Sequence, residues 1–262
     1  MRDQTLVKAD RSFIHSVRKC FQVLECLGEA QRPLSFTELV QASRLERSAV
    51  QRLVHTLAQL GYLRQHPRTR AYTLSPRLLQ FSYAALQVDP VAEAAEPYLQ
   101  KLNQQCKETV NLMELESSDI VYVLRYPSFH AVSVDLHVGS RLPVHCTAAG
   151  RVFMAHMAPE ELEALLALPR PKLTEHTITG EAALRQILTQ VRQQGYCLNN
   201  QEAFLGDISI AAPLFDRHRE VVGAINIAVA FPRWTVPAVR KKLVPLLLET
   251  AQKITQQLTR ST

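Results

Sequence analysis

The chain has 262 residues, 47% of them hydrophobic and 21% charged, with a formal net charge of +6. This balance is typical of a folded protein with one large or two ordinary domains, and it excludes a disordered chain. No apolar run is long enough to span a membrane, no signal peptide precedes Phe13, and the five cysteines form no CxxC pair, so we expect a cytoplasmic protein without disulfides.

A helix is predicted over 13–29, and its apolar residues are expected to pack beneath a pair of helices at 35–60. Ser35 and Glu38 have the spacing of a capping box, which favours a helix start there. Gly61 is typical of the residue that follows a helix C-terminus. The apolar positions that define the faces are Ile14, Val17, Phe21, Leu24 and Leu27 in the first helix, and Val50, Leu53, Val54, Leu57 and Leu60 in the last.

Two short strands are predicted at 62–65 and 71–74, around a turn. Three helices followed by a two-stranded ribbon indicate a winged helix-turn-helix. Residues 1–74 hold 12 Lys or Arg against 6 Asp or Glu, so the whole charge excess lies there, as in nucleic-acid binders. The alternative is an ordinary helical hairpin with a solvated polar face. The candidate DNA contacts are Ser35, Arg47, Ser48, Gln51, Arg52, His55, Arg64, Arg68 and Arg70.

The rest of the chain begins with two helix-start signals. Ser75-Pro76 and Asp89-Pro90 each place proline directly after an N-cap residue, which predicts a linker helix and then a helix to about residue 106. Strands and helices that follow in runs predict an α+β domain with a mixed or antiparallel sheet. The expected strands are 110–116, 120–125, 131–136, 195–198, 208–215 and 221–230, and the expected helices are 148–156, 159–166, 180–194 and 237–258, the last with Pro245 as a potential kink.

Three motifs carry a resemblance to a known family. They are ERSAVQRLVHTLAQLGYL at 46–63, VGSRLPVHCTAAGRVFMAH at 138–156, and the segment 195–230 that ends in GAINIAVA. Together they resemble the IclR family of bacterial transcription regulators, and VGSRLP, AAGR and GAINIA resemble most its branch that controls aromatic-acid breakdown through the β-ketoadipate pathway.

The resemblance implies a domain organisation and a set of partners. A winged helix-turn-helix domain at 13–75 would bind double-stranded operator DNA, a linker helix would cover 76–88, and a GAF-like α/β effector-binding sensor domain would cover 89–262. It also implies homodimers through the DNA-binding domains, and often tetramers. The sequence leaves open dimer or tetramer, activator or repressor, the operator and the effector.

By motif position, the resemblance implies an effector pocket at Ala148, Ala149, Asn199, Ser209, Asn226 and Ala228. Family members that bind small keto acids tend to have an acidic residue near 199 and a thiol near 209. This chain has Asn and Ser at these positions, which argues against a keto acid of two or three carbons.

The residues themselves favour an anion at the start of the helix predicted at 148–156. Thr147 is a good N-cap, and the small residues after it would present free N–H groups at the positive end of a helix. Met113, Leu136 and Val138 are expected to form an apolar wall. The hypothesis is a small organic acid effector, aromatic or dicarboxylic, that controls a catabolic operon; the alternative is that the small residues serve only close helix–sheet packing.

Three other classes of function are alternatives: an enzyme, a purely structural DNA-binding protein and a redox-sensing regulator. No GxSxG, HExxH or phosphate-binding glycine loop occurs, so we expect no catalytic residue, metal or cofactor, and no enzyme. A purely structural DNA-binding protein would leave the neutral C-terminal region without a task. A redox-sensing DNA-binding regulator that uses Cys146 and Cys197 remains the alternative function.

Overall fold

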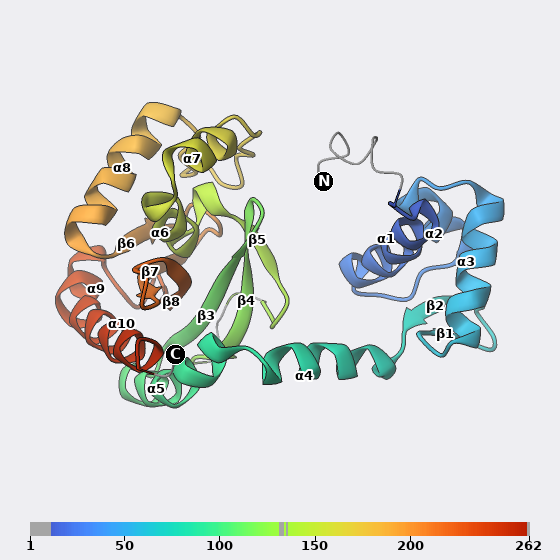
Figure 1. Ribbon diagram of the computed structural model, residues 1–262, viewed down its shortest axis with the longest axis horizontal. Coiled ribbons are helices and arrows are strands. Elements are labelled where there is room, and N and C mark those ends of the chain that lie inside the picture. The colour runs from blue at the N-terminus through green and yellow to red at the C-terminus, as the bar shows by residue number, and fades with distance from the viewer. Residues whose placement is uncertain (1–11, 131–133, 135, 261–262) are drawn as a thin grey trace. The chain divides into compact units, whose positions relative to one another are not determined.

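The computed structural model describes residues 12–130, 134 and 136–260. The chain divides into two compact units after Gln87, and each is described on its own below (Figure 1). No helix of the described residues is both long and apolar enough to cross a membrane. The finer division into 13–75, 76–88 and 89–262 stays a prediction.

The first unit is a helix-turn-helix with a wing. The core combines α1, α2, α3 and β1, with Val23, Leu39, Val50, Val54 and Leu57 buried at its centre. Strands β1 and β2 pair antiparallel, with Leu63 opposite Leu74. The elements are α1 (His15–Ala30), α2 (Phe36–Ser43), α3 (Arg47–Gln59), β1 (Leu63–Gln65), β2 (Tyr72–Leu74), the short 3-10 helix η1 (Pro76–Leu78) and α4 (Leu79–Gln87).

Both predicted helix boundaries of the helix pair are confirmed. The Ser35 hydroxyl accepts from the Glu38 N–H at 3.3 Å, and the Glu38 carboxylate accepts from the Ser35 N–H at 2.8 Å. Gly61 has φ +81 after α3, a conformation that glycine adopts without strain. The next N–H, of Tyr62, donates back to the Leu57 carbonyl at 2.8 Å and closes the helix end.

The predicted apolar face of α1 was partly wrong. Ile14, Val17 and Phe21 are 62%, 48% and 59% exposed, although they were expected to pack beneath the helix pair. The core contacts α1 only from Cys20 onward, chiefly through Val23 and Leu27. The helix therefore carries two apolar stripes, and only the C-terminal one meets the core.

The second unit is an α+β domain, as predicted. Its described strands form a six-stranded antiparallel sheet in the order β5-β4-β3-β8-β7-β6. Helices α5 and α10 pack on one face of this sheet, and α6 packs on the other and is covered by α8 (Figure 1). The strands are β3 (Thr109–Glu116), β4 (Asp119–Tyr126), β5 (Arg141–Pro143), β6 (Cys197–Asn200), β7 (Asp207–Phe215) and β8 (Val221–Ala230). The helices are α5 (Pro90–Cys106), the short 3-10 helix η2 (Val144–Cys146), α6 (Ala148–His156), α7 (Pro159–Leu166), α8 (Glu181–Gln194), α9 (Val236–Lys242) and α10 (Val244–Leu258).

The predicted elements of this unit need four corrections. The helix expected at 237–258 is two helices divided at Leu243, because Pro245 lacks the N–H that would continue the hydrogen-bond ladder and sits instead in the first turn of α10. Strand β5 was not predicted, and β6 begins two residues later than expected. The strand expected at 131–136 falls largely outside the described residues; Val134 and Leu136, which are described, are not in a strand.

Candidate functional site

The outer face of α3 carries the polar residues that the sequence singled out. Val50, Val54 and Leu57 face the core, so the residues between them point away from it. Arg47 also lies over the Phe36 ring, with its guanidinium carbon 4.7 Å from the ring centre, a contact between α2 and α3 that the sequence did not indicate. The exposed residues on this face are Arg47, Ser48, Gln51, Arg52 and His55.

The wing presents Arg64, Arg68 and Arg70, all exposed. Its turn is held by the His66 ring, whose Nδ1 accepts from the N–H groups of Arg68 and Thr69 at 3.3 and 3.1 Å. Ser35 differs from the other candidates, because its hydroxyl already caps α2. Its structural role is clear, and its contact with DNA stays a prediction.

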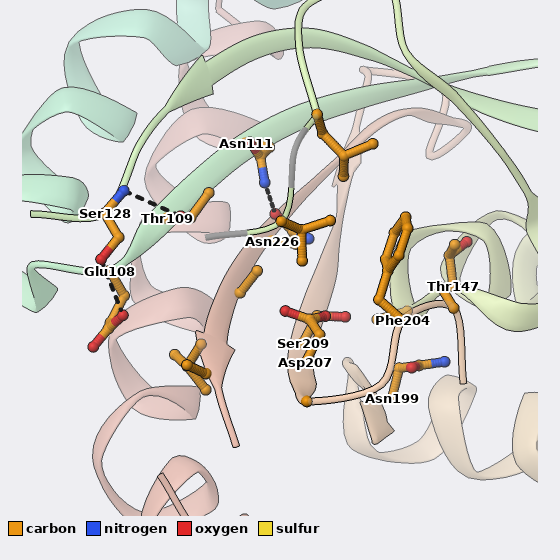
Figure 2. Close-up of a pocket in the computed structure, with 18 of the residues that line it drawn as sticks. Glu108, Thr109, Asn111, Ser128, Thr147, Asn199, Phe204, Asp207, Ser209 and Asn226 are labelled. Carbon is orange, nitrogen blue, oxygen red and sulfur yellow. Dashed lines mark hydrogen bonds between the residues drawn. The ribbon is translucent and has the colours of Figure 1, made fainter. Parts of the chain in front are cut away.

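A cavity of about 660 Å³ lies between α6 and the sheet of the second unit (Figure 2). Two of the predicted residues do not line it: Met113 is packed in the core beneath α6, and Val138 is 44% exposed outside the cavity. Both were expected to form an apolar wall because their side chains are apolar. An apolar side chain does not by itself show whether a residue lies in the core, at the cavity or on the surface. The predicted residues that do line the cavity are Leu136, Thr147, Ala148, Ala149, Asn199, Ser209, Asn226 and Ala228.

The N-terminus of α6 opens onto this cavity. Thr147 Oγ1 accepts from the Gly150 N–H at 3.1 Å and caps the helix, as predicted. The N–H groups of Ala148 and Ala149 have no acceptor within the part of the chain that the structure describes. A helix N-terminus carries a partial positive charge, so these two donors favour an anion.

A row of hydrogen bonds crosses the sheet on the cavity side. The Arg125 guanidinium donates to Asn111 Oδ1 at 3.2 Å, and Asn111 Nδ2 donates to Asn226 Oδ1 at 2.7 Å. Arginine can only donate, so it fixes the orientation of the Asn111 amide, and that amide fixes the orientation of Asn226. The Asn226 amino group is therefore presented to the cavity as a donor, and it has no acceptor among the described residues.

Asn199, a predicted effector residue, lines the cavity with an amide that is engaged by neighbouring backbone groups. Its Nδ2 donates to the Cys146 carbonyl at 2.9 Å, and its Oδ1 accepts from the Glu202 N–H at 3.2 Å. Glu202 in turn forms a buried ion pair with Arg151, at 2.6 and 2.5 Å. These contacts hold the loop after β6, whose Phe204 and Leu205 line the cavity.

Tyr122 and Asp207 are polar residues of the cavity that were missed from the sequence, whereas Ser209 was predicted. Tyr122 and Ser209 are 5% and 8% exposed, and neither hydroxyl has a hydrogen-bond partner among the described residues. Asp207 lies two residues before Ser209 on β7 and faces the same cavity (Figure 2). Side chains two residues apart on a strand point to the same face, so the predicted Ser209 could have indicated Asp207.

Burial sets the ionisation of these groups. It raises the pKa of Asp207 to about 7, and the nearby Arg125 guanidinium opposes part of that rise. Burial also raises the pKa of the Tyr122 hydroxyl, with a further contribution from Asp207. By contrast, Glu108 at another part of the cavity wall is held by Arg233 at 2.6 Å and Trp234 at 2.8 Å.

The two cysteines of the redox alternative are inaccessible. Cys146 and Cys197 are 0% and 1% exposed, and burial raises the pKa of each thiol to about 12. Oxidation requires an accessible thiolate, so the structure gives the redox alternative no support.

A winged helix-turn-helix with a basic outer face, joined to a second domain that contains a cavity lined by both polar and apolar residues, defines a DNA-binding transcription regulator. Comparison with known families agrees: residues 16–67 match the IclR helix-turn-helix domain, and residues 83–256 match the bacterial transcriptional regulator IclR C-terminal domain. The chain belongs to the IclR family of transcription regulators, and it is not an enzyme.

Individual relatives are similar over nearly the whole chain. The Pca regulon regulatory protein of Pseudomonas putida is 34% identical over 95% of this chain and 86% of its own. A candidate transcriptional regulator from Rhodococcus sp. RHA1 has a TM-score of 0.83 and 32% identity, and covers 95% of this chain and 100% of its own. An IclR homologue from Microbacterium hydrocarbonoxydans, solved as a complex with 4-hydroxybenzoate, shares the fold with a TM-score of 0.79 at 24% identity, over 94% and 100% of the two chains.

Proposed function

We propose that this regulator controls a catabolic operon by binding a small organic acid, aromatic or dicarboxylic, in the cavity beneath α6. The observation that carries the proposal is that three donors without an acceptor among the described residues line the same cavity: the Ala148 and Ala149 N–H groups and the Asn226 amino group. A carboxylate satisfies such donors through charge-assisted hydrogen bonds. The cavity volume of about 660 Å³ lies in the range of small-molecule sites.

The proposed DNA contacts follow from the exposed faces of the first unit. Arg47 and Gln51 lie in the first turns of α3, where a recognition helix meets base edges. Arginine pairs with guanine and glutamine with adenine through two hydrogen bonds. Arg52 is assigned to a base or phosphate, Ser48 and His55 to the same groove, and Arg64, Arg68 and Arg70 to the backbone or minor groove. Operator DNA as partner supports a cytoplasmic location, which is part of the proposal.

We further propose a homo-oligomer that assembles through the first unit. The exposed stripe of Ile14, Val17 and Phe21 on α1 is apolar, and α4 exposes Leu79 and Phe81, at 67% and 58%. Several large apolar side chains exposed on one unit favour a protein interface. A twofold dimer would present two copies of α3 to half-sites about 34 Å apart, one turn of DNA.

Calorimetric titration of the full-length protein tests the effector class. Benzoate, 4-hydroxybenzoate and adipate represent the two acid types, and benzamide is a neutral counterpart of benzoate. At least one acid should bind, and it should raise the free energy of unfolding by about 2.7 kcal/mol at one hundred times its Kd. Binding of benzamide with no binding of any acid would show that the anion site is wrongly assigned.

A further inference from the structure

We infer that Asp207 selects an effector with a single carboxylate, whose far end carries a neutral hydrogen-bond donor such as a hydroxyl group. By the same contact Asp207 rejects a second carboxylate at that end. The inference rests on the proposed function and narrows it, because it decides between the aromatic hydroxy acids and the dicarboxylic acids that the anion site alone would admit.

The first step is that one part of the cavity offers only donors. Arg125 can only donate, and the hydrogen bonds through Asn111 pass this polarity to the Asn226 amino group. Asn226 is 5% exposed, so its amino group is enclosed by protein except on the cavity side. Together with the α6 N-terminus, it defines where the carboxylate of the effector binds.

The second step is that Asp207 offers only an acceptor when ionised. Its carboxylate has no hydrogen-bond or ion-pair partner within the described part of the chain. This distinguishes it from Glu108, which also lines the cavity and pairs with Arg233. A partly buried acid without a partner leaves its acceptor capacity for a bound molecule.

The third step is the spacing between the donor part and Asp207. Asn226 lies opposite Ala211 on β7, four residues along the strand from Asp207. With a rise of about 3.4 Å per residue and about 4.8 Å between strands, the two Cα atoms are roughly 14 Å apart. One aromatic ring with a polar group at each end, plus a hydrogen bond of about 2.8 Å at both ends, fits this span. Ser209 lies two residues from Asp207 on the same face of β7, between Asp207 and Ala211, the residue opposite Asn226 (Figure 2).

The charges around Asp207 then decide between the two types of acid. Two groups interact with its charge, the Tyr122 hydroxyl and the Arg125 guanidinium, both on β4. Arg125 donates to Asn111 and to the Val134 carbonyl at 2.9 Å, and it keeps its positive charge. That charge lowers the pKa of Asp207 by less than burial raises it, so Asp207 is compensated only in part. A second carboxylate there meets a like charge, whereas a hydroxyl donates to it.

The ionisation of Asp207 adds a second readout. Because burial raises its pKa to about 7, Asp207 gains its charge across neutral pH. A hydroxyl donor binds the ionised form more strongly, so affinity for a hydroxylated acid rises from pH 6 to pH 8. A second carboxylate binds the protonated form better, so its affinity falls over the same range.

The experiment uses three ligands that share a ring and a carboxylate and differ only in the para position: benzoate, 4-hydroxybenzoate and benzene-1,4-dicarboxylate. Each is titrated calorimetrically into the full-length protein and into Asp207→Asn, Asp207→Ala and Glu160→Gln. Glu160 is exposed in the first turn of α7, so its variant controls for the loss of one negative charge outside the cavity. Thermal unfolding checks that each variant is folded.

The unaltered protein should bind 4-hydroxybenzoate about 10- to 100-fold more tightly than benzoate, the effect of one hydrogen bond to a charged group, and the dicarboxylate most weakly. Asp207→Ala should reduce the hydroxyl preference to less than threefold. Asp207→Asn keeps one acceptor oxygen, so it should retain part of that preference, improve the dicarboxylate about tenfold, and abolish the pH dependence. Glu160→Gln should match the unaltered protein.

The outcomes separate this inference from the function on which it rests. If none of the three acids binds, the aromatic effector class is wrong and the inference fails with it. If the acids bind but the dicarboxylate is preferred, or Asp207→Ala keeps the full hydroxyl preference, only the role of Asp207 is overturned. If Asp207→Ala is unfolded, the isosteric Asp207→Asn tests the role of Asp207. The two measurements are its affinity for the dicarboxylate and the pH dependence of binding.

Discussion

At the scale of single residues, Gly150 shows how tightly α6 is seated against the chain before it. A Cβ at Gly150 would lie 2.3 Å from both the Cα atom and the carbonyl oxygen of Val144. Backbone atoms cannot move aside as a flexible side chain can, so a larger residue would displace the start of α6 and with it the Ala148 and Ala149 N–H groups.

We therefore expect Gly150→Ala to lower the free energy of unfolding by about 1–3 kcal/mol, as in other overpacked sites, and to weaken acid binding at least tenfold. Urea unfolding and calorimetry measure the two effects. Gly180→Ala is the matched control, because a Cβ at Gly180 meets nothing within 4 Å. If Gly150→Ala is as stable as the unaltered chain and binds the acid as tightly, α6 is not packed closely against Val144.

The Arg151–Glu202 pair makes a second prediction at this scale. Glu202→Gln leaves the 1% exposed Arg151 with an uncompensated charge, which costs about 3–5 kcal/mol in buried pairs. It should also loosen the loop after β6 and so weaken acid binding. Glu163→Gln removes one acid of an exposed pair, 2.7 Å from Arg185, and should leave the unfolding midpoint nearly unchanged. Equal midpoints for the two variants in urea unfolding would contradict this account.

At the scale of elements, α3 and the wing are expected to contribute to DNA binding in different ways. A base reader on α3 sets sequence preference, whereas a cation on the wing contacts phosphate whatever the sequence. The two contributions are separable, because phosphate contacts carry the salt dependence of binding.

Gln51→Ala should cost about 1–3 kcal/mol on the preferred operator and change little on unrelated DNA. Arg68→Ala should weaken both, and should reduce the slope of log K against log salt by about one. Gln59→Ala, at the far end of the same helix, is the control. Fluorescence anisotropy at several salt concentrations measures all three; a Gln51→Ala protein with unchanged preference and slope would remove Gln51 from the base readers.

The elements also show which features the sequence could predict and which it could not. Local signals sufficed for α6, α7 and β8, because N-caps, proline and apolar periodicity act within a few residues. They did not show the row of hydrogen bonds from Arg125 through Asn111 to Asn226, although the family resemblance implied Asn226 itself. The row depends on which strands pair and in which register, and the two asparagines are 115 residues apart in the chain. Periodicity also did not show which of two apolar stripes on α1 meets the core, since both have helical spacing.

At the scale of the whole molecule, the exposed stripe on α1 is the proposed site of assembly. Phe21→Glu places a charge in the proposed interface between two copies of the chain, and should raise the dissociation constant of the oligomer at least tenfold in analytical ultracentrifugation. Leu168→Glu, which alters a 43% exposed residue of the second unit, should not. If Phe21→Glu sediments as the unaltered protein does, the α1 stripe is not the interface.

An acid in the cavity can alter DNA binding only through its different affinity for the states of the protein. Such coupling is typically about 1–3 kcal/mol, or 5- to 150-fold, and it is reciprocal. Bound DNA should therefore change the affinity for the acid by the same factor that the acid changes the affinity for DNA.

The most direct test is the affinity of the full-length protein for a DNA site selected by the protein from a random pool, measured by anisotropy with and without saturating 4-hydroxybenzoate. We predict a 5- to 150-fold change in Kd, and a much smaller change when Gly150→Ala replaces the unaltered chain. An acid that binds the cavity, as calorimetry would show, yet leaves the DNA affinity unchanged would contradict the account that this chain is an acid-responsive regulator.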